Sequence, residues 1–189
     1  MPYKDRENYS EQTIQRLLYE HFKDMDYKMS NVYMFGGSPG WESDFFFMTK
    51  ARQTWEIEIK VDRQDFDRDF QLKPKKHRLF QQCYDDEDPG KLFLPNSYCF
   101  CAPEGVIPED KVPEYAGLME VTSDYKIKYS IKVPKLHNET ENIDATLLKK
   151  FYNKSLRLEK LLAEFRIQLF ENPDDQDEIV NKFLKTIRM

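Results

Sequence analysis

The sequence predicts an α/β protein made of one globular core and a helical extension. Three observations predict this class. A helical apolar pattern begins near the N-terminus, short apolar and aromatic runs with strand character lie between Tyr27 and Val133, and helical spacing returns after Pro134. Of the 189 residues, 40% are hydrophobic and 14% are aromatic, which is enough for a packed core. We therefore expect a core over residues 1–135 and a C-terminal helical extension over 136–189, packed on the core.

The first element is predicted to be a helix over residues 11–23. Ser10 is a suitable N-cap, and apolar residues then recur at helical spacing as Ile14, Leu17, Leu18 and Phe22. Glu11 lies at the edge of this apolar stripe. Two interpretations of Glu11 stay open: it faces the sheet, or it is a first-turn acidic residue favoured by the helix dipole.

Three strands are predicted next, over residues 27–35, 42–48 and 54–61. The first two are separated by Gly36-Gly37-Ser38-Pro39-Gly40, which holds half of the chain's six glycines. This segment is either a hairpin turn or a loop that lets a nucleic-acid backbone approach closely.

The middle of the chain predicts one interrupted helix and three later strands. Residues 62–70 read as a loop that enters a helix, and the helix continues toward Gln81 with an interruption at Pro74. Strands are then predicted over 96–102, 117–121 and 125–133, the last of them at an edge of the sheet.

The C-terminal segment predicts one long amphipathic helix, ended by Pro173, and a short final helix. The apolar positions that carry this prediction are Leu147, Phe151, Leu158, Leu162, Phe165 and Leu169, and then Ile179, Val180, Phe183, Leu184 and Ile187. The apolar faces either pack against the sheet or form a surface for a homodimer or a protein partner.

The candidate functional residues are Asp44, Glu58 and Lys60. Asp44 precedes the run Phe45-Phe46-Phe47-Met48, and Glu58 and Lys60 lie two apart on the next strand-like run, so their side chains project to one face. If the two runs pair as a hairpin, Asp44 reaches the same place. Two carboxylates and an ammonium group can hold a hard divalent cation and activate water beside an anionic substrate.

This arrangement resembles the PD-(D/E)XK nuclease superfamily, whose core pattern is an Asp, a variable gap and then Glu-x-Lys. Ser43 stands where the pattern has Pro. The blocks that follow resemble the MmcB-like DNA-repair branch: Lys60 with Asp65-Phe66, then Tyr98-Cys99-Phe100-Cys101-Ala102-Pro103-Glu104-Gly105, then Ala116-Gly117-Leu118. The resemblance covers about residues 10–135. It implies a restriction-endonuclease-like core, with a mixed β-sheet flanked by helices.

The resemblance also implies roles for individual residues. Asp44 and Glu58 would bind Mg²⁺ or Mn²⁺ with help from the Ile59 carbonyl, and Lys60 would act on the water or the phosphate. Superfamily members often carry a metal-binding Glu on the first helix, and Glu11 is the matching position. The implied activity is metal-dependent hydrolysis of DNA in repair, recombination or processing. The alternative is a catalytically silent DNA-binding or interaction module on the same fold.

The densest basic stretch is Lys73-Pro74-Lys75-Lys76-His77-Arg78, in a chain of net charge −5. Its position soon after Lys60 suggests phosphate contacts from Lys73, Lys75, Lys76 and Arg78. The alternative is a solvated helix or loop face. An acidic balance does not indicate a general nucleic-acid-binding surface, so only local clustering supports DNA as the partner.

The remaining composition predicts a cytoplasmic protein without membrane contact. The N-terminus is polar, and no apolar run reaches the roughly 18 residues of a spanning helix. The three cysteines, Cys83, Cys99 and Cys101, form no even framework, and we expect them to be small buried core residues.

Overall fold

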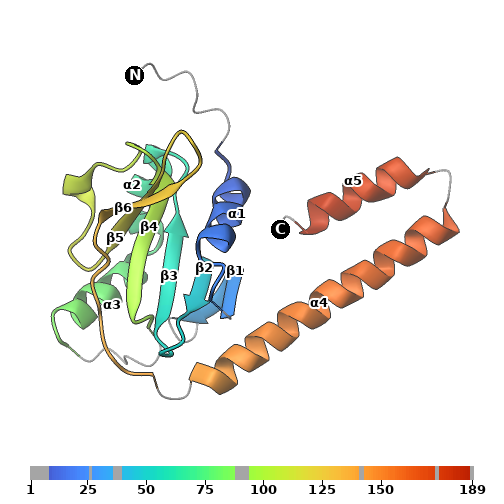
Figure 1. Ribbon diagram of the computed structural model, residues 1–189. Coiled ribbons are helices and arrows are strands. Elements are labelled where there is room, and N and C mark those ends of the chain that lie inside the picture. The colour runs from blue at the N-terminus through green and yellow to red at the C-terminus, as the bar shows by residue number, and fades with distance from the viewer. Residues whose placement is uncertain are drawn as a thin grey trace. The chain divides into compact units, whose positions relative to one another are not determined.

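A computed structural model of the chain describes residues 9–25, 27–35, 40–87, 94–140, 143–172 and 175–187. Within these residues a six-stranded sheet forms, with its strands side by side in sequence order (Figure 1). The strands are β1 (Tyr27–Phe35), β2 (Trp41–Met48), β3 (Thr54–Ile59), β4 (Ser97–Pro103), β5 (Gly117–Val121) and β6 (Ile127–Ile131). Residues 36–39 of the predicted glycine-rich loop lie outside the described residues.

The sheet is mixed. β1, β2 and β3 pair antiparallel, β4 and β5 continue parallel to β3, and β6 returns antiparallel on β5. The parallel step from β3 to β4 runs through α2 (Arg63–Leu72) and α3 (Pro74–Tyr84), as parallel pairing requires a crossover connection. An α/β class with a mixed sheet flanked by helices is therefore confirmed.

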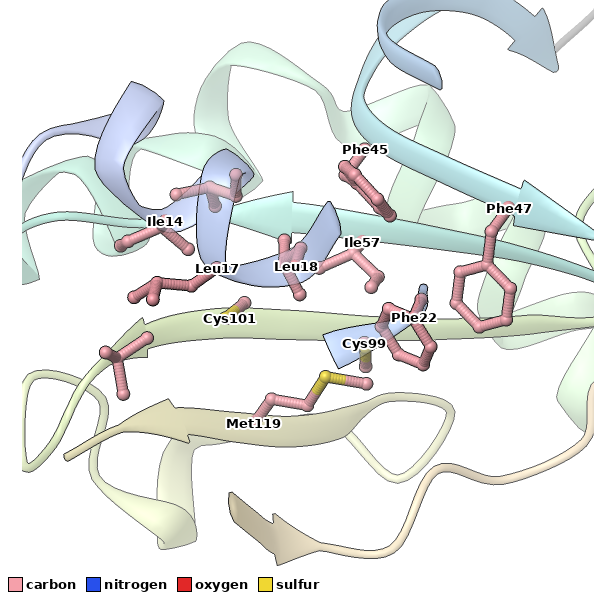
Figure 2. Close-up of a cluster of buried hydrophobic side chains, with 12 residues drawn as sticks. Ile14, Leu17, Leu18, Phe22, Phe45, Phe47, Ile57, Cys99, Cys101 and Met119 are labelled. Atoms are coloured by element: carbon pink, nitrogen blue, oxygen red, sulfur yellow. The ribbon is translucent and has the colours of Figure 1, made fainter. Parts of the chain in front are cut away.

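The helix α1 (Glu11–His21) covers one face of the sheet. The backbone N–H of Thr13 donates to Ser10 Oγ at 3.1 Å, so Ser10 is the expected N-cap. The apolar stripe of α1 packs on alternate residues of the central strands, and the cysteines of β4 lie among them (Figure 2). The sheet residues of this core are Phe45, Phe47, Ile57, Ile59, Cys99, Cys101, Met119 and Val121.

The helices α2 and α3 belong to the opposite face. Asp62 caps α2 by accepting from the backbone N–H of Asp65 at 2.8 Å. Pro74 stands in the first turn of α3, where its missing N–H costs nothing, so the predicted interruption is a boundary between two helices. Buried aromatic rings join both helices to β4: Phe66 of α2 packs on Phe100, and Phe80 of α3 packs on Tyr98.

The last strand lies at the edge, as predicted, but is shorter than 125–133. Thr122 and Lys126 close a tight turn through a 2.9 Å bond between Thr122 N–H and the Lys126 carbonyl. Tyr125 has φ of 59° in this turn, so it belongs to the connection and not to the strand.

The chain divides into two compact units, Met1–Ile143 and Asp144–Met189. The second contains most of α4 (Ile143–Glu171) and all of α5 (Gln176–Ile187), which match the two predicted C-terminal helices. Phe165 of α4 and Phe183 of α5 stack with ring centres 4.2 Å apart. Packing of this extension on the core stays a prediction.

Candidate functional site

The strand β3 presents acidic and basic side chains to the face covered by α2 and α3. Its odd-numbered residues Ile57 and Ile59 enter the core beneath α1. Glu56, Glu58 and, just beyond the strand, Lys60 therefore point to the other face. These three side chains are 0%, 1% and 4% exposed. The alternation of side chains along β3, which the sequence predicts, therefore produces a buried cluster of charges.

Asp44 joins this cluster at the point where β2 leaves β3. The last paired residues are Phe45 and Ile57, so Asp44 lies one step further, opposite Glu58. Asp44 Oδ2 accepts a 2.7 Å hydrogen bond from the backbone N–H of Ile59, in place of the next ladder bond. Burial, and then the negative charge of Glu58, raise the pKa of Asp44 to about 8. The structure thus brings Asp44, Glu58 and Lys60 together.

Three lysines surround the Glu58 carboxylate. Lys60 Nζ lies 3.0 Å from Oε1, Lys76 Nζ lies 2.5 Å from Oε2, and Lys73 also pairs with Oε1. Burial opposes ionisation of Glu58, but the ammonium groups, led by Lys76, hold its pKa below the usual value. Glu58 is therefore a buried anion surrounded by ammonium groups.

Lys76 corrects the prediction of a phosphate contact. It is only 1% exposed, and its Nζ lies 2.7 Å from Glu56 Oε1 and 4.8 Å from the centre of the Tyr98 ring. Trp41 Nε1 donates to both oxygens of Glu56, at 2.9 and 3.0 Å. A side chain committed to two buried carboxylates does not reach a phosphate in solvent, so Lys76 belongs to the interior of the site.

Lys60 is also held by α2 and α3. Its Nζ lies 2.7 Å from Asp69 Oδ1, and Asp69 Oδ2 lies 2.8 Å from His77 Nε2. His77 Nδ1 lies 2.7 Å from the Tyr115 hydroxyl. Sequence reasoning assigns no role to Asp69, His77 or Tyr115, because nothing in their spacing places them beside Lys60.

A sequence signal for the burial of Lys76 did exist. Lys76, Phe80 and Cys83 recur at four and then three residues on α3, which is the spacing of one helix face. The basic composition of the stretch conceals this periodicity, because lysine is ordinarily a surface residue.

Glu11 is linked to Asp44 through a bridging amide. Gln15 Nε2 donates to Glu11 Oε1 at 2.9 Å, to Asn31 Oδ1 at 2.6 Å and to the Asp44 carbonyl at 3.2 Å. Burial, followed by the charges of Glu42 and Glu58, raises the pKa of Glu11. Glu11 is thus at the same end of the sheet as Asp44, and its role as a metal ligand stays a prediction.

The other predicted basic residues differ in exposure. The Lys73 side chain is 30% exposed, and its Nζ also lies 3.3 Å from Asp69 Oδ1. Lys75 and Arg78 lie three residues apart on the exposed side of α3. Of the four predicted phosphate contacts, these two side chains and part of Lys73 are therefore exposed to solvent.

The donor chemistry of the site fits Mg²⁺ or Mn²⁺. The described residues contain no group of three His, Cys, Asp or Glu side chains gathered to hold a metal. Mg²⁺, however, is commonly bound by one or two carboxylates and several waters. Four buried or half-buried carboxylates (Asp44, Glu56, Glu58 and Asp69) face three ammonium groups (Lys60, Lys73 and Lys76). The fourth carboxyl, Asp44, keeps its proton up to a pKa of about 8, so a cation bound there would displace that proton.

The cysteines have no part in the site. All three are buried thiols outside any disulfide, and burial raises the pKa of Cys101 to about 12. They are the small core residues that the sequence predicted.

Comparisons with known proteins support the fold alone. No family model and no curated protein sequence matches the chain. Among solved structures the chain is similar to the SPO1766 protein of unknown function from Silicibacter pomeroyi, at 16% sequence identity and a TM-score of 0.55, covering 89% of this chain and 95% of that one. In the part of the chain described by the structure, no helix is both long and apolar enough to cross a membrane.

Proposed function

We propose that the protein is a metal-dependent nuclease that hydrolyses phosphodiester bonds in DNA, on a restriction-endonuclease-like core of the PD-(D/E)XK type. One observation carries this proposal: Asp44, Glu58 and Lys60 meet where β2 and β3 separate. Repair, recombination or other DNA processing is the context that the sequence resemblance suggests.

Each of these residues has a proposed role. Asp44 and Glu58, with the Ile59 carbonyl, would hold Mg²⁺ or Mn²⁺, and Glu11 would assist from α1. Such an ion, when bound, lowers the pKa of a water ligand and offsets negative charge on the phosphate. Lys60 stabilises charge at the phosphate and orients the attacking water through its ammonium group.

The proposed DNA contacts are Lys73, Lys75 and Arg78. Lys75 and Arg78 share the exposed side of α3, and Lys73 stands at its beginning, with its ammonium group already at Glu58. A phosphate backbone bound along the exposed side of α3 would therefore contact Lys75 and Arg78 first and then reach the carboxylates through Lys73.

A second candidate function is a DNA-binding or interaction module without catalysis. The observation that favours it is the Glu58 carboxylate, since both of its oxygens are already paired with lysines. A cation would have to compete with these ammonium groups. The two functions make different predictions for cleavage: the nuclease cuts DNA when Mg²⁺ or Mn²⁺ is added, and the binding module cuts DNA with neither metal.

The first prediction tests cleavage. The wild-type protein, freed of contaminating nucleases, should cut at least one member of a panel of duplex, single-stranded and branched DNA with Mg²⁺ or Mn²⁺, and none with EDTA. Lys60→Met keeps the length of the side chain and should reduce cleavage by at least 100-fold, as loss of one charge-stabilising group does elsewhere. Lys50→Met, an exposed lysine in the β2–β3 turn, is the matched control and should cut normally. Absence of cleavage by the wild type with either metal would refute the enzymatic proposal and favour the binding module.

The second prediction tests the ligands. Isothermal titration should show Mn²⁺ binding more tightly than Mg²⁺, in the usual order for divalent ions. Asp44→Asn removes one negative charge and keeps the acceptor for the Ile59 N–H, so it should weaken Mn²⁺ binding at least tenfold. Asp67→Asn, at an exposed carboxylate paired with Arg63, should leave the affinity unchanged. Equal Mn²⁺ affinity in the Asp44→Asn and wild-type proteins would exclude Asp44 as a ligand.

A further inference from the structure

The position of Lys60 depends on groups outside the strand that carries it. A lysine ammonium group ends a flexible four-carbon stem, so it has no fixed place without partners. Glu58 supplies one partner from the same strand. The second short contact comes from Asp69 of α2, whose Oδ1 lies 2.7 Å from Lys60 Nζ.

Asp69 is itself held at its other oxygen. Its Oδ2 lies 2.8 Å from His77 Nε2 of α3, and the residue is 3% exposed. The His77 hydrogen bond and nearby lysines outweigh the effect of burial and hold the pKa of Asp69 well below its usual range. The carboxylate therefore joins Lys60 on one side to His77 on the other.

The His77 ring is fixed on both edges and on one face. Because Asp69 is an acceptor, Nε2 carries the proton of this contact, and Nδ1 lies 2.7 Å from the Tyr115 hydroxyl oxygen. Phe70 stacks on the ring at 4.3 Å between centres, with 30° between the planes. Tyr115 lies in the connection before β5, so three separate segments meet at this imidazole.

We propose that Asp69, His77 and Tyr115 form a positioning chain that holds the Lys60 ammonium group at Glu58, the carboxylate beside Asp44. The inference rests on the proposed nuclease function and adds three residues to that site. None of the three is a catalytic residue, since Lys60 stands between the chain and the place of a phosphate. Their effect on the reaction passes through the orientation of Lys60.

The test uses the full-length protein and two substitutions of His77. His77→Phe keeps a planar ring and removes the donor to Asp69, whereas His77→Gln keeps an N–H that can reach Asp69. His77→Phe should lower kcat by about 10- to 100-fold, the usual effect of losing an outer partner. KM for DNA and Mn²⁺ affinity should stay within about twofold, because the residues that touch DNA and metal are unchanged. His77→Gln should restore most of kcat, and Tyr115→Phe should give a smaller loss than His77→Phe.

The matched control is Cys83→Ala, at a buried position of α3 six residues after His77. It should lower thermal stability and leave kcat unchanged, which separates positioning from general destabilisation. If wild type and control cut DNA and a folded His77→Phe protein keeps full kcat, the positioning chain is refuted and the nuclease proposal stands.

A second measurement does not depend on cleavage. An ordered, hydrogen-bonded lysine ammonium group gives a resolvable ¹⁵N–¹H NMR signal, which the Lys60→Met protein assigns by its disappearance. His77→Phe and Tyr115→Phe should weaken or remove the Lys60 signal, while Cys83→Ala keeps it. An unchanged Lys60 signal in both variants would overturn the positioning chain, whether or not the wild type cuts DNA.

Discussion

At the scale of single residues, the site consists of buried charges that depend on one another. Lys76 is held between Glu56 and Glu58, and all three side chains are buried. Removing one partner of a buried ion pair commonly costs about 3–5 kcal/mol, because the other is left uncompensated, whereas replacing both by neutral groups costs much less.

We therefore predict that Lys76→Met lowers the free energy of unfolding by about 3 kcal/mol, measured by urea denaturation. Lys75→Met, at the exposed neighbouring position, should change it by less than about 0.5 kcal/mol. Adding Glu56→Gln to Lys76→Met should recover part of the loss, because the uncompensated carboxylate is removed. Additive losses in the double variant would contradict the coupling of Lys76 to Glu56.

At the scale of elements, the segment that follows β6 packs closely against the start of β5, and this packing depends on Gly117. A Cβ built on Gly117 would lie 2.5 Å from Val133 Cγ2 and 2.7 Å from Val133 Cα. Val133 follows β6, so the contact holds the segment after the edge strand against the start of β5. Backbone atoms cannot move aside as a side chain can, and the position admits no larger residue.

Gly117→Ala should accordingly lower the free energy of unfolding by about 1–3 kcal/mol, the usual cost of an overpacked site. Gly105→Ala is the control for backbone strain, because Gly105 has φ of 73° and no atom within 4 Å of its Cβ position. It should cost only about 1–2 kcal/mol, through backbone conformation. Chemical denaturation of both variants measures the loss in the free energy of unfolding. Hydrogen exchange then tests whether the amides of β6 lose protection in Gly117→Ala. Unaltered β6 protection in Gly117→Ala would rule out the steric explanation.

At the scale of the whole molecule, the shifted pKa values of the site's carboxyl groups make stability depend on pH. The folded-state pKa of Asp44 is about 8, above its ordinary value of 3.8, so between these values the folded protein keeps a proton that the unfolded chain has released. The stability from Asp44 is fully present below about pH 4 and is lost as pH rises through 8. Glu58 and Asp69 act in the opposite sense, since their lowered pKa values give stability that is lost as pH falls.

The Asp44→Asn protein isolates the first of these effects. Without metal, the free energy of unfolding of wild type minus that of Asp44→Asn should fall between pH 5 and 8, with a limiting slope of about 1.4 kcal/mol per pH unit. The contributions of Glu58 and Asp69 largely cancel in this difference. Saturating Mn²⁺ should reverse the trend, because a cation favours the ionised carboxylate. A difference independent of pH, measured by urea denaturation, would show that Asp44 ionises normally in the folded protein.

The sequence by itself determined the order of the elements and the placement of Glu58 and Lys60 on one side of β3. Both follow from local rules: helical spacing and capping for α1, and alternation along a strand for β3. The pairing of β2 with β3, which brings Asp44 to Glu58, was also within reach, because a short connection favours an antiparallel hairpin.

Only the tertiary structure decided the partners of these residues. The crossover through α2 and α3 returns the chain over β3, so Asp69, Lys73, Lys76 and His77 meet Glu58 and Lys60 across the face of the sheet. Helical spacing indicates which side of α3 is buried, but local sequence does not show which opposite charges lie beneath that side, since those charges come from another element. Burial and pairing are properties of packed elements, and packing is decided by the whole chain.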